Sequence, residues 1–180
     1  MPSQSRLHSV CVRVAASILL VTAAACTQPK APPRVFAMGE RAEAGTLVYN
    51  VLESSWKTQL GEGVQVRVPQ NRFLLLRLSV TNGGASAVSA PPTTLVSTSG
   101  AEYPELTDGE GVEDWLGVLR PLKPTETLFG WVLFDAPRGE CQLRVSDDAF
   151  DPADAKLAMI QIPLRLEGHS DYLPGTKTNR

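Results

Sequence analysis

The chain has 180 residues, of which 43% are hydrophobic, and a formal net charge of −2. This length suits one domain with appendages, and the hydrophobic content supports a packed core rather than general disorder. The chain lacks the basic surplus that neutralises phosphate backbones, so nucleic acid is not an expected partner. Fourteen prolines and fourteen glycines favour short strands separated by turns.

Residues 1–25 have the three parts of a secretory signal. Arg6 and Arg13 precede an uncharged run, VAASILLVTAAA, that ends in small residues. This run of 12 residues is too short to cross a bilayer as a helix, which takes about 20 apolar residues. We therefore predict a signal peptide over 1–25.

Cys26 directly follows three alanines, and Ala23-Ala24-Ala25-Cys26 resembles the lipobox of bacterial lipoproteins. In such proteins the cysteine thiol receives a diacylglycerol and becomes the new N-terminus. Residues 26–34 continue as proline-rich sequence, and eight extended residues reach about 25 Å. We predict a lipid on Cys26, a flexible tether over 26–34 and anchoring to a bacterial membrane outside the cytoplasm. The alternative is ordinary cleavage, which would release a soluble secreted protein.

Cysteine and histidine usage restricts the chemistry. If Cys26 is acylated, Cys141 is expected to be a small buried hydrophobic residue; otherwise the two could form a disulfide. His169 is the only histidine after residue 25, and it lies in the polar tail 168–180. Copper sites, common zinc sites and a Ser-His-Asp triad are therefore not expected, and we predict no enzyme activity.

Apolar residues alternate with polar ones through the body of the chain, residues 35–167. In FLLLRLSVTN, for example, Leu74, Leu76 and Leu78 would share one face. This period is typical of strands with one face on a core and the other in water. Strands are predicted over 46–52, 64–69, 73–82, 127–137, 141–145 and 159–166. Turn signals between them favour an antiparallel, immunoglobulin-like β-sandwich, with Pro163 at an edge or a bulge.

Two segments are apolar beyond what alternation requires. TLFGWVLFDAP, residues 127–137, is apolar on both faces and predicts either a covered central strand or an exposed patch that meets a partner. DWLGVLRPL, residues 114–122, predicts a cap over the end of the sandwich or a protein-binding knob. Trp115 and Trp131 are therefore the candidate partner-binding residues.

Two acidic segments are candidate calcium loops, residues 102–114 and 147–154. Asp108, Glu110, Glu113 and Asp114 are the candidate metal ligands, because calcium takes 6–8 oxygen ligands. Their spacing does not match an EF-hand loop. The simpler interpretation is a pair of solvated acidic loops, with Asp151-Pro152 at the start of a turn or at a helix N-cap.

Four stretches occur in an order typical of a known family: MGERAEAGTLVYNVLESSW, RFLLLRLSVTNGG, TLVSTSGAEY and LKPTETLFGWVLFDAP. Together they resemble a bacterial domain-of-unknown-function family of secreted immunoglobulin-like lipoproteins, akin to the mycobacterial immunoprotective extracellular antigens. The resemblance covers roughly residues 36–166. It implies a fold and a location outside the cytoplasm, but no activity and no site residues.

These observations predict a non-catalytic binding or accessory module of the bacterial envelope, anchored to the membrane through Cys26. The expected partner is an envelope protein or polymer, met through loops or an open sheet edge. The alternative is a module that binds calcium or a small ligand through the acidic loops 102–114 and 147–154. A hydrolase using paired carboxylates is the third hypothesis.

Overall fold

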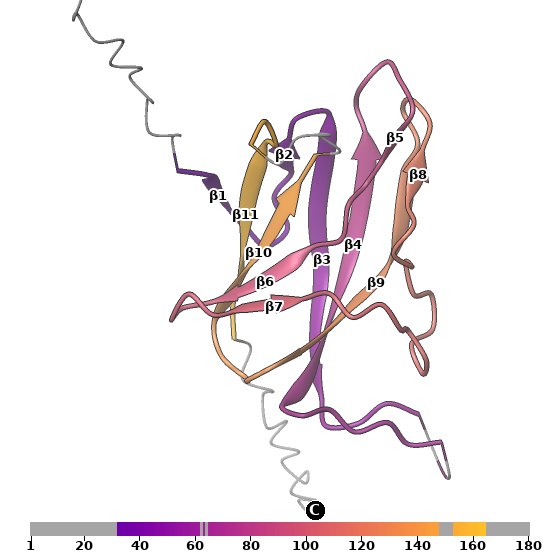
Figure 1. Cartoon of the computed structure of the whole chain (residues 1–180), viewed down its shortest axis with the longest axis vertical. Coiled ribbons are helices and arrows are strands. Elements are labelled where there is room, and N and C mark those ends of the chain that lie inside the picture. Colours follow the sequence, from indigo (N-terminus) through magenta and orange to yellow (C-terminus); the bar gives the residue numbers. More distant parts are fainter. Residues whose placement is uncertain (1–31, 62, 64, 148–152, 165–180) are drawn as a thin grey trace, which may run out of the picture. The chain divides into compact units, whose positions relative to one another are not determined.

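Strands and turns, with no helix, make up the part of the chain that the structure describes, residues 32–61, 63, 65–147 and 153–164. The structure is a computed structural model with eleven strands in this part (Figure 1). Accordingly, no helix long and apolar enough to cross a membrane occurs among these residues. The predicted signal peptide, Cys26, most of the tether, His169 and the tail 168–180 lie outside the described residues.

One face of the sandwich is a five-stranded sheet in the order β1-β11-β10-β6-β7. Strand β1 pairs parallel to β11, and the other neighbours are antiparallel. The strands are β1 (Arg34–Ala37), β6 (Thr94–Ser97), β7 (Glu102–Pro104), β10 (Cys141–Ser146) and β11 (Leu157–Ile162).

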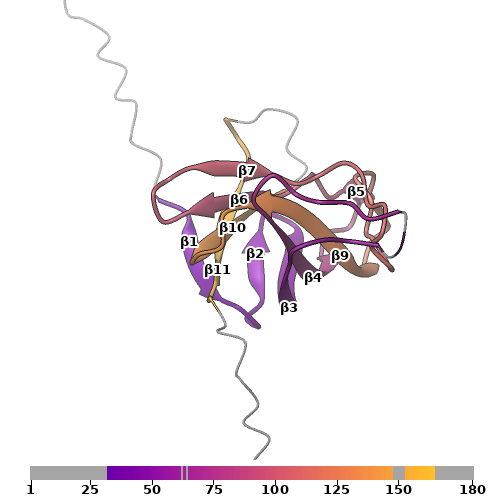
Figure 2. The same ribbon diagram turned by 90° about the horizontal axis from the view of Figure 1, so that it is seen from below.

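The other face is a four-stranded antiparallel sheet in the order β2-β3-β4-β9. Its strands are β2 (Ala42–Ala44), β3 (Leu47–Lys57), β4 (Arg72–Asn82) and β9 (Thr127–Ala136). Two short strands, β5 (Val88–Ser89) and β8 (Pro121–Leu122), form a separate pair. Figure 2 shows the two main sheets from below, on either side of the interior.

The core lies between the inward faces of the two sheets, as the alternating pattern predicts. Leu74, Leu76 and Leu78 of β4 are fully buried there. Each such side chain contributes about 1.5–3 kcal/mol through burial. Tyr49 of β3 is buried as well, and its hydroxyl donates a hydrogen bond of 2.7 Å to the Ser146 carbonyl on β10. The predicted β-sandwich is therefore confirmed.

A second, smaller apolar cluster covers the outer face of the four-stranded sheet at one end. It arises because β4 and β9 are apolar on both faces in this part of their length. Its buried residues are Leu60, Phe73, Leu75 and Leu133, and Leu106, Val112 and Trp131 pack against them. Two long connections, one between β3 and β4 and one between β7 and β8, supply the residues that come from outside the sheet.

The strand predicted over 64–69 is wrong. The segment belongs to the connection between β3 and β4, and its described part forms only one bridge, Leu60 to Arg67. Val66 and Val68 are 38% and 71% exposed. A β-prone sequence becomes a strand only where a partner and a buried face exist, and β3 and β4 already pair with each other here.

Two further expectations need correction. Strand β11 ends at Ile162, before Pro163, which cannot donate a ladder hydrogen bond. Strand β9 is the last strand of its sheet rather than a central one. Its outer face is covered only in part, because Leu133 is buried whereas Phe129 is 62% exposed.

Cys141 is a buried free thiol at the start of β10, as predicted, with 4% of its surface exposed. Burial raises the pKa of this thiol to about 11, because the thiolate would lose its hydration. The alternative of a disulfide with Cys26 involves a residue outside the described part of the chain.

Candidate functional site

Residues 106–119, here called the strap, run along the free edge of β9. The Leu106 amide donates a hydrogen bond of 2.8 Å to the Leu133 carbonyl. Farther along the strap, the Trp131 amide donates to the Asp114 carbonyl and the Leu116 amide donates to the Trp131 carbonyl, each at 2.9 Å. These bonds make a parallel bridge between Trp115 and Trp131. The strap therefore covers part of an edge that would otherwise be open.

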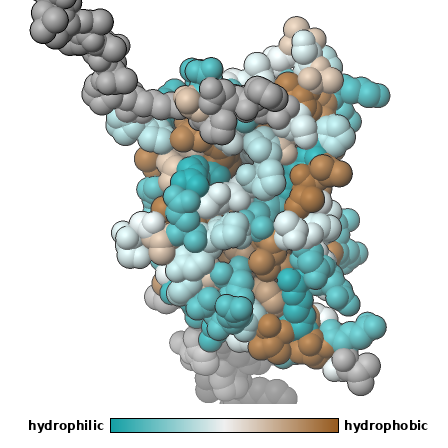
Figure 3. Space-filling view, in the orientation of Figure 1, coloured by the Kyte–Doolittle hydropathy of each residue, from teal (hydrophilic) through white to brown (hydrophobic). Residues whose placement is uncertain are grey.

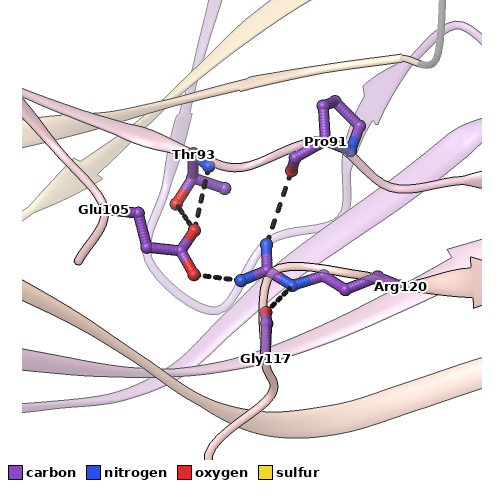
Figure 4. A network of polar contacts seen from close by, with 5 residues as sticks. All are labelled: Pro91, Thr93, Glu105, Gly117 and Arg120. Atoms are coloured by element: carbon purple, nitrogen blue, oxygen red, sulfur yellow. Dashed lines mark hydrogen bonds and ion pairs between the residues drawn. The ribbon is translucent and has the colours of Figure 1, made fainter. Parts of the chain in front are cut away.

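The residues that flank the strap, Glu105 and Arg120, form an ion pair with each other, and both side chains are fully buried (Figure 4). The second Glu105 carboxylate oxygen accepts hydrogen bonds from the amide and the hydroxyl of Thr93, both at 2.9 Å. Arg120 also donates to the carbonyls of Gly117 and Pro91. The strap is thus a loop whose two flanking residues are held together by an ion pair. Hydrogen bonds from Thr93 connect this pair to the segment that leads into β6.

Glycine allows the strap to come this close to its neighbours. A Cβ atom added at Gly130 would lie 2.6 Å from the Asp114 carbonyl oxygen and 3.1 Å from the Leu116 Cα. Within the strap, a Cβ at Gly109 would overlap the Trp115 indole at 2.1 Å. Both glycines therefore mark close approaches that no larger residue permits without a shift.

Asp114 has a left-handed backbone conformation, with φ of 53°. This conformation costs a non-glycine residue about 1 kcal/mol and persists where the surroundings impose it. Here the imposing contact is the hydrogen bond from the Trp131 amide to the Asp114 carbonyl. The Asp114 carboxylate has no hydrogen-bond or ion-pair partner in the described part of the chain.

Beside Asp114 is a hollow of about 220 Å³, lined by Arg77, Asp114, Phe129 and Gly130. Arg77 lies on β4 and is paired with Glu53 of β3 at 2.9 Å. The cross-strand register places Arg77 opposite Trp131. The hollow therefore combines an exposed aromatic ring, an unpaired carboxylate and a guanidinium group on a rigid sheet.

The predicted metal ligands all lie on the strap, but the structure does not gather them. Asp108 pairs with Arg67 at 3.5 Å and accepts a hydrogen bond from the Glu110 amide. No group of three or more His, Cys, Asp or Glu residues able to hold a metal ion occurs among the described residues. The second acidic loop lies partly outside them, at 148–152. Calcium binding stays a prediction.

The first carboxylate of the acidic segment is also paired. Glu102 on β7 and Arg144 on β10 form two parallel hydrogen bonds of 2.5 and 2.8 Å. The hydrogen bond from Arg144 lowers the pKa of Glu102, and the same bond raises the pKa of Arg144. Of the six carboxylates in this segment, Glu102, Glu105 and Asp108 therefore have arginine partners.

Both predicted partner-binding tryptophans lie at this site. Trp131 is half-buried and packs against the second apolar cluster, while the Trp115 indole nitrogen is buried with no hydrogen-bond partner among the described residues. Sequence reasoning did not single out Phe129 or Arg77 as site residues. Phe129 could have been identified from its position two residues before Trp131, because residues two apart in a strand lie on the same face.

Two other hollows are less suited to recognition. One of about 300 Å³ is lined by residues at one end of the five-stranded sheet, including Cys141, Gln142 and Gln161. Another of about 380 Å³ lies beside β8 and includes Leu122 and Lys123. Neither is lined by an aromatic ring. On the side of β6 and β7, which Figure 3 shows, hydrophobic residues occur in separate spots among hydrophilic ones.

Comparison with protein families gives one match, the domain of unknown function DUF4352, over residues 36–155. The chain belongs to this family. The DUF4352 match spans the strands from β2 to β10 and the strap, so the candidate site lies inside the family domain. It confirms the resemblance to a bacterial domain-of-unknown-function family.

Solved structures resemble this DUF4352 domain at low sequence identity. Bacillus subtilis yjhA is 13% identical with a TM-score of 0.56, over 71% of this chain and 99% of that chain. The Bacillus subtilis "putative lipoprotein (ycdA)" is 12% identical with a TM-score of 0.53, and the match covers 71% of this chain and 40% of that one. The secreted Mycobacterium tuberculosis protein MPT63 is 15% identical, with a TM-score of 0.48, over 73% and 99%.

The likenesses to yjhA and ycdA show the fold alone. No curated protein sequence matches the chain.

Proposed function

We propose that this protein is a non-catalytic accessory module that works outside the cytoplasm and binds a component of the bacterial envelope through the outer face of β9. The observation that carries the proposal is Phe129, the third residue of β9, which is 62% exposed although it is a large aromatic residue within a strand. A ring on a rigid strand can contact a partner without losing much conformational freedom. The hollow beside it supplies polar groups that would orient the partner.

The location follows from the N-terminal sequence. Residues 1–25 have the composition of a signal peptide, and Cys26 follows directly. Seven residues separate Cys26 from the first strand, which begins at Arg34. The description of ycdA as a "putative lipoprotein" is consistent with an anchor of this kind.

Binding is favoured over catalysis because three of the six carboxylates in the segment 102–114 are paired with arginines. A hydrolase using two carboxylates needs one as the acid and one as the base or nucleophile, both facing the substrate. Here Glu105 is fully buried against Arg120, and Glu102 and Asp108 form ion pairs with arginines at the surface. These contacts give the three acidic groups structural roles.

The test is photo-cross-linking of the full chain in intact cells, with p-benzoylphenylalanine in place of Phe129. The matched control carries the same group at Leu119, which is 86% exposed at the end of the strap. We expect an adduct with one discrete envelope component, protein or glycan, from position 129 and not from position 119. Equal labelling at both positions would contradict the proposed binding face.

The anchor is tested separately by mass spectrometry of wild type and a Cys26→Ser variant. The wild type is expected to carry a diacylglycerol on its N-terminal cysteine and to fractionate with membranes. Cys26→Ser should lose both properties. An unmodified Cys26 in the wild type would show that the anchoring part of the proposal is wrong.

A further inference from the structure

The surface around Phe129 is aromatic at its centre and uncharged along two rows of the sheet, with Val48 of β3 beside Thr81 in the second row. Cross-strand register places Ser79 of β4 opposite Phe129 and Asn50 of β3 opposite Ser79. In the next row the hydroxyls of Thr81 and Thr127 are hydrogen-bonded to each other at 2.8 Å. Protein-binding patches usually have a core of several apolar side chains. Here the phenyl ring is the only aromatic among the large exposed hydrophobic side chains of the described residues.

The local charge excludes one class of ligand. Arg77 is neutralised by Glu53 at 2.9 Å. On the strap, the side chains of Glu110, Glu113 and Asp114 have no cationic partner in the part of the chain that the structure describes. The strap beside the hollow therefore carries a net negative charge, which repels an anionic polymer and favours an uncharged or cationic one.

The hollow also limits the size of what enters it. Its volume of about 220 Å³ is below the roughly 300–1,000 Å³ of pockets that enclose a whole small molecule. It is open along the sheet surface where Phe129 is exposed. One ring of a longer chain fits this description, with the neighbouring units lying on the sheet outside the hollow.

We infer that the hollow binds one uncharged or amino-sugar ring of an envelope polysaccharide. A pyranose has an apolar C–H face, which would lie on the Phe129 ring, and equatorial hydroxyls around its rim. Those hydroxyls donate to the Asp114 carboxylate and accept from the Arg77 guanidinium, which gives charge-assisted hydrogen bonds. Asp114, which has a left-handed backbone conformation, is one of the residues that line the hollow. The inference rests on the proposed function and names the chemistry of its partner.

The test is titration of the full chain, purified in detergent, with three hexasaccharide probes. These are an N-acetylglucosamine hexamer, a glucosamine hexamer and a glucuronic acid hexamer as the anionic control. Binding is followed by isothermal titration calorimetry and by tryptophan fluorescence, since Trp131 is on the same face two residues from Phe129. We expect one of the first two to bind with a Kd of about 1 mM, as suits a single-ring site of about twelve atoms.

Variants identify the site. Phe129→Ala should weaken binding at least tenfold, and Asp114→Asn should do the same while tolerating the left-handed backbone. Leu119→Ala, which removes an exposed apolar side chain outside the hollow, should leave the Kd unchanged. Thermal melting of each variant shows whether the fold is kept. An equal loss of binding in Leu119→Ala would overturn the inference.

The other possible results of the titration and of the cross-linking experiment also test the inference. No heat with either hexamer at about 10 mM, or tighter binding of the glucuronic acid hexamer, would overturn the inference. If cross-linking from position 129 captures a discrete protein, the partner is a protein, so the inference fails while the proposed function stands. If no adduct forms at position 129 and no sugar binds, both fail.

Discussion

Gly130 is the residue at which strap and strand come closest. An added Cβ would meet the Asp114 carbonyl oxygen at 2.6 Å, and this neighbour is backbone held by hydrogen bonds to Trp131. We expect Gly130→Ala to lower the free energy of unfolding by about 1–3 kcal/mol, because the strap must shift to admit the methyl group. The measurement is urea unfolding followed by tryptophan fluorescence.

Gly139 is the matched control for this experiment, since a Cβ there meets nothing within 4 Å. Gly139→Ala should change the free energy of unfolding by less than about 0.5 kcal/mol. Similar losses for both substitutions would show that the close approach at Gly130 is not the cause.

Cys141 makes stability depend on alkaline pH. The thiol of the folded protein keeps its proton up to a pKa of about 11, whereas the thiol of the unfolded chain has a pKa of about 9.0. Between these values the unfolded chain has lost the proton and the folded one has kept it, so the free energy of unfolding falls as pH rises. The loss approaches about 2–3 kcal/mol near pH 11.

The measurement is urea unfolding at several pH values between 8 and 11, for wild type and Cys141→Ala. The variant should be less stable at pH 8 because of the small void, but its stability should fall less steeply with pH. Parallel curves for the two proteins would contradict the assigned role of the thiol.

At the scale of an element, the strap depends on the buried pair at its base. Glu105→Gln leaves the Arg120 charge buried without a counter-charge, and we expect a loss of about 3–5 kcal/mol in the free energy of unfolding. The double variant Glu105→Leu with Arg120→Met removes both charges and should lose less than Glu105→Gln alone. Thermal or urea unfolding measures both, and a loss below about 1 kcal/mol for Glu105→Gln would be inconsistent with the buried geometry.

Some elements could be predicted because alternation records burial directly. The inward residues of β3 and β4 follow it closely, and those strands pair as expected. The segment 64–69 alternates equally well, yet its described residues form no strand. Alternation shows that a segment could form a strand with one buried face, but it does not show whether another strand is free to pair with it. Strand β11 ends before Pro163 because proline has no backbone N–H to donate, and this end of the strand could have been predicted from the sequence.

The candidate site was predictable only in part, for a similar reason. Trp115 and Trp131 stand out by their size in apolar segments, and the structure does bring them together. The contact of Arg77 with the β9 face depends on the register between two strands about fifty residues apart. The burial of the Glu105–Arg120 pair could not be predicted from the sequence either, because charged residues are ordinarily expected at the surface.

At the scale of the whole molecule, the two sheets are joined by polar as well as apolar contacts. The Tyr49 hydroxyl on β3 donates across the interior to the Ser146 carbonyl on β10. Tyr49→Phe keeps the ring and removes this bond, so we expect a loss of about 1 kcal/mol in the free energy of unfolding, with the fold retained. Thermal unfolding and circular dichroism measure the two effects. An unchanged melting temperature would mean that water replaces the bond at no cost.

The path of the chain through residues 34–44, which form β1 and β2, has a mechanical consequence. Strand β1 pairs with β11 at one border of the five-stranded sheet, and β2 pairs with β3 at one border of the four-stranded sheet. The chain therefore contributes one strand to each sheet before it enters the long strands β3 and β4. A force applied at Arg34 would act first on the pairing of β1 with β11 and then on the pairing of β2 with β3, so strands of both sheets resist it. If the domain is tethered at this point, a force on the tether would have to break both pairings before it could separate the two sheets.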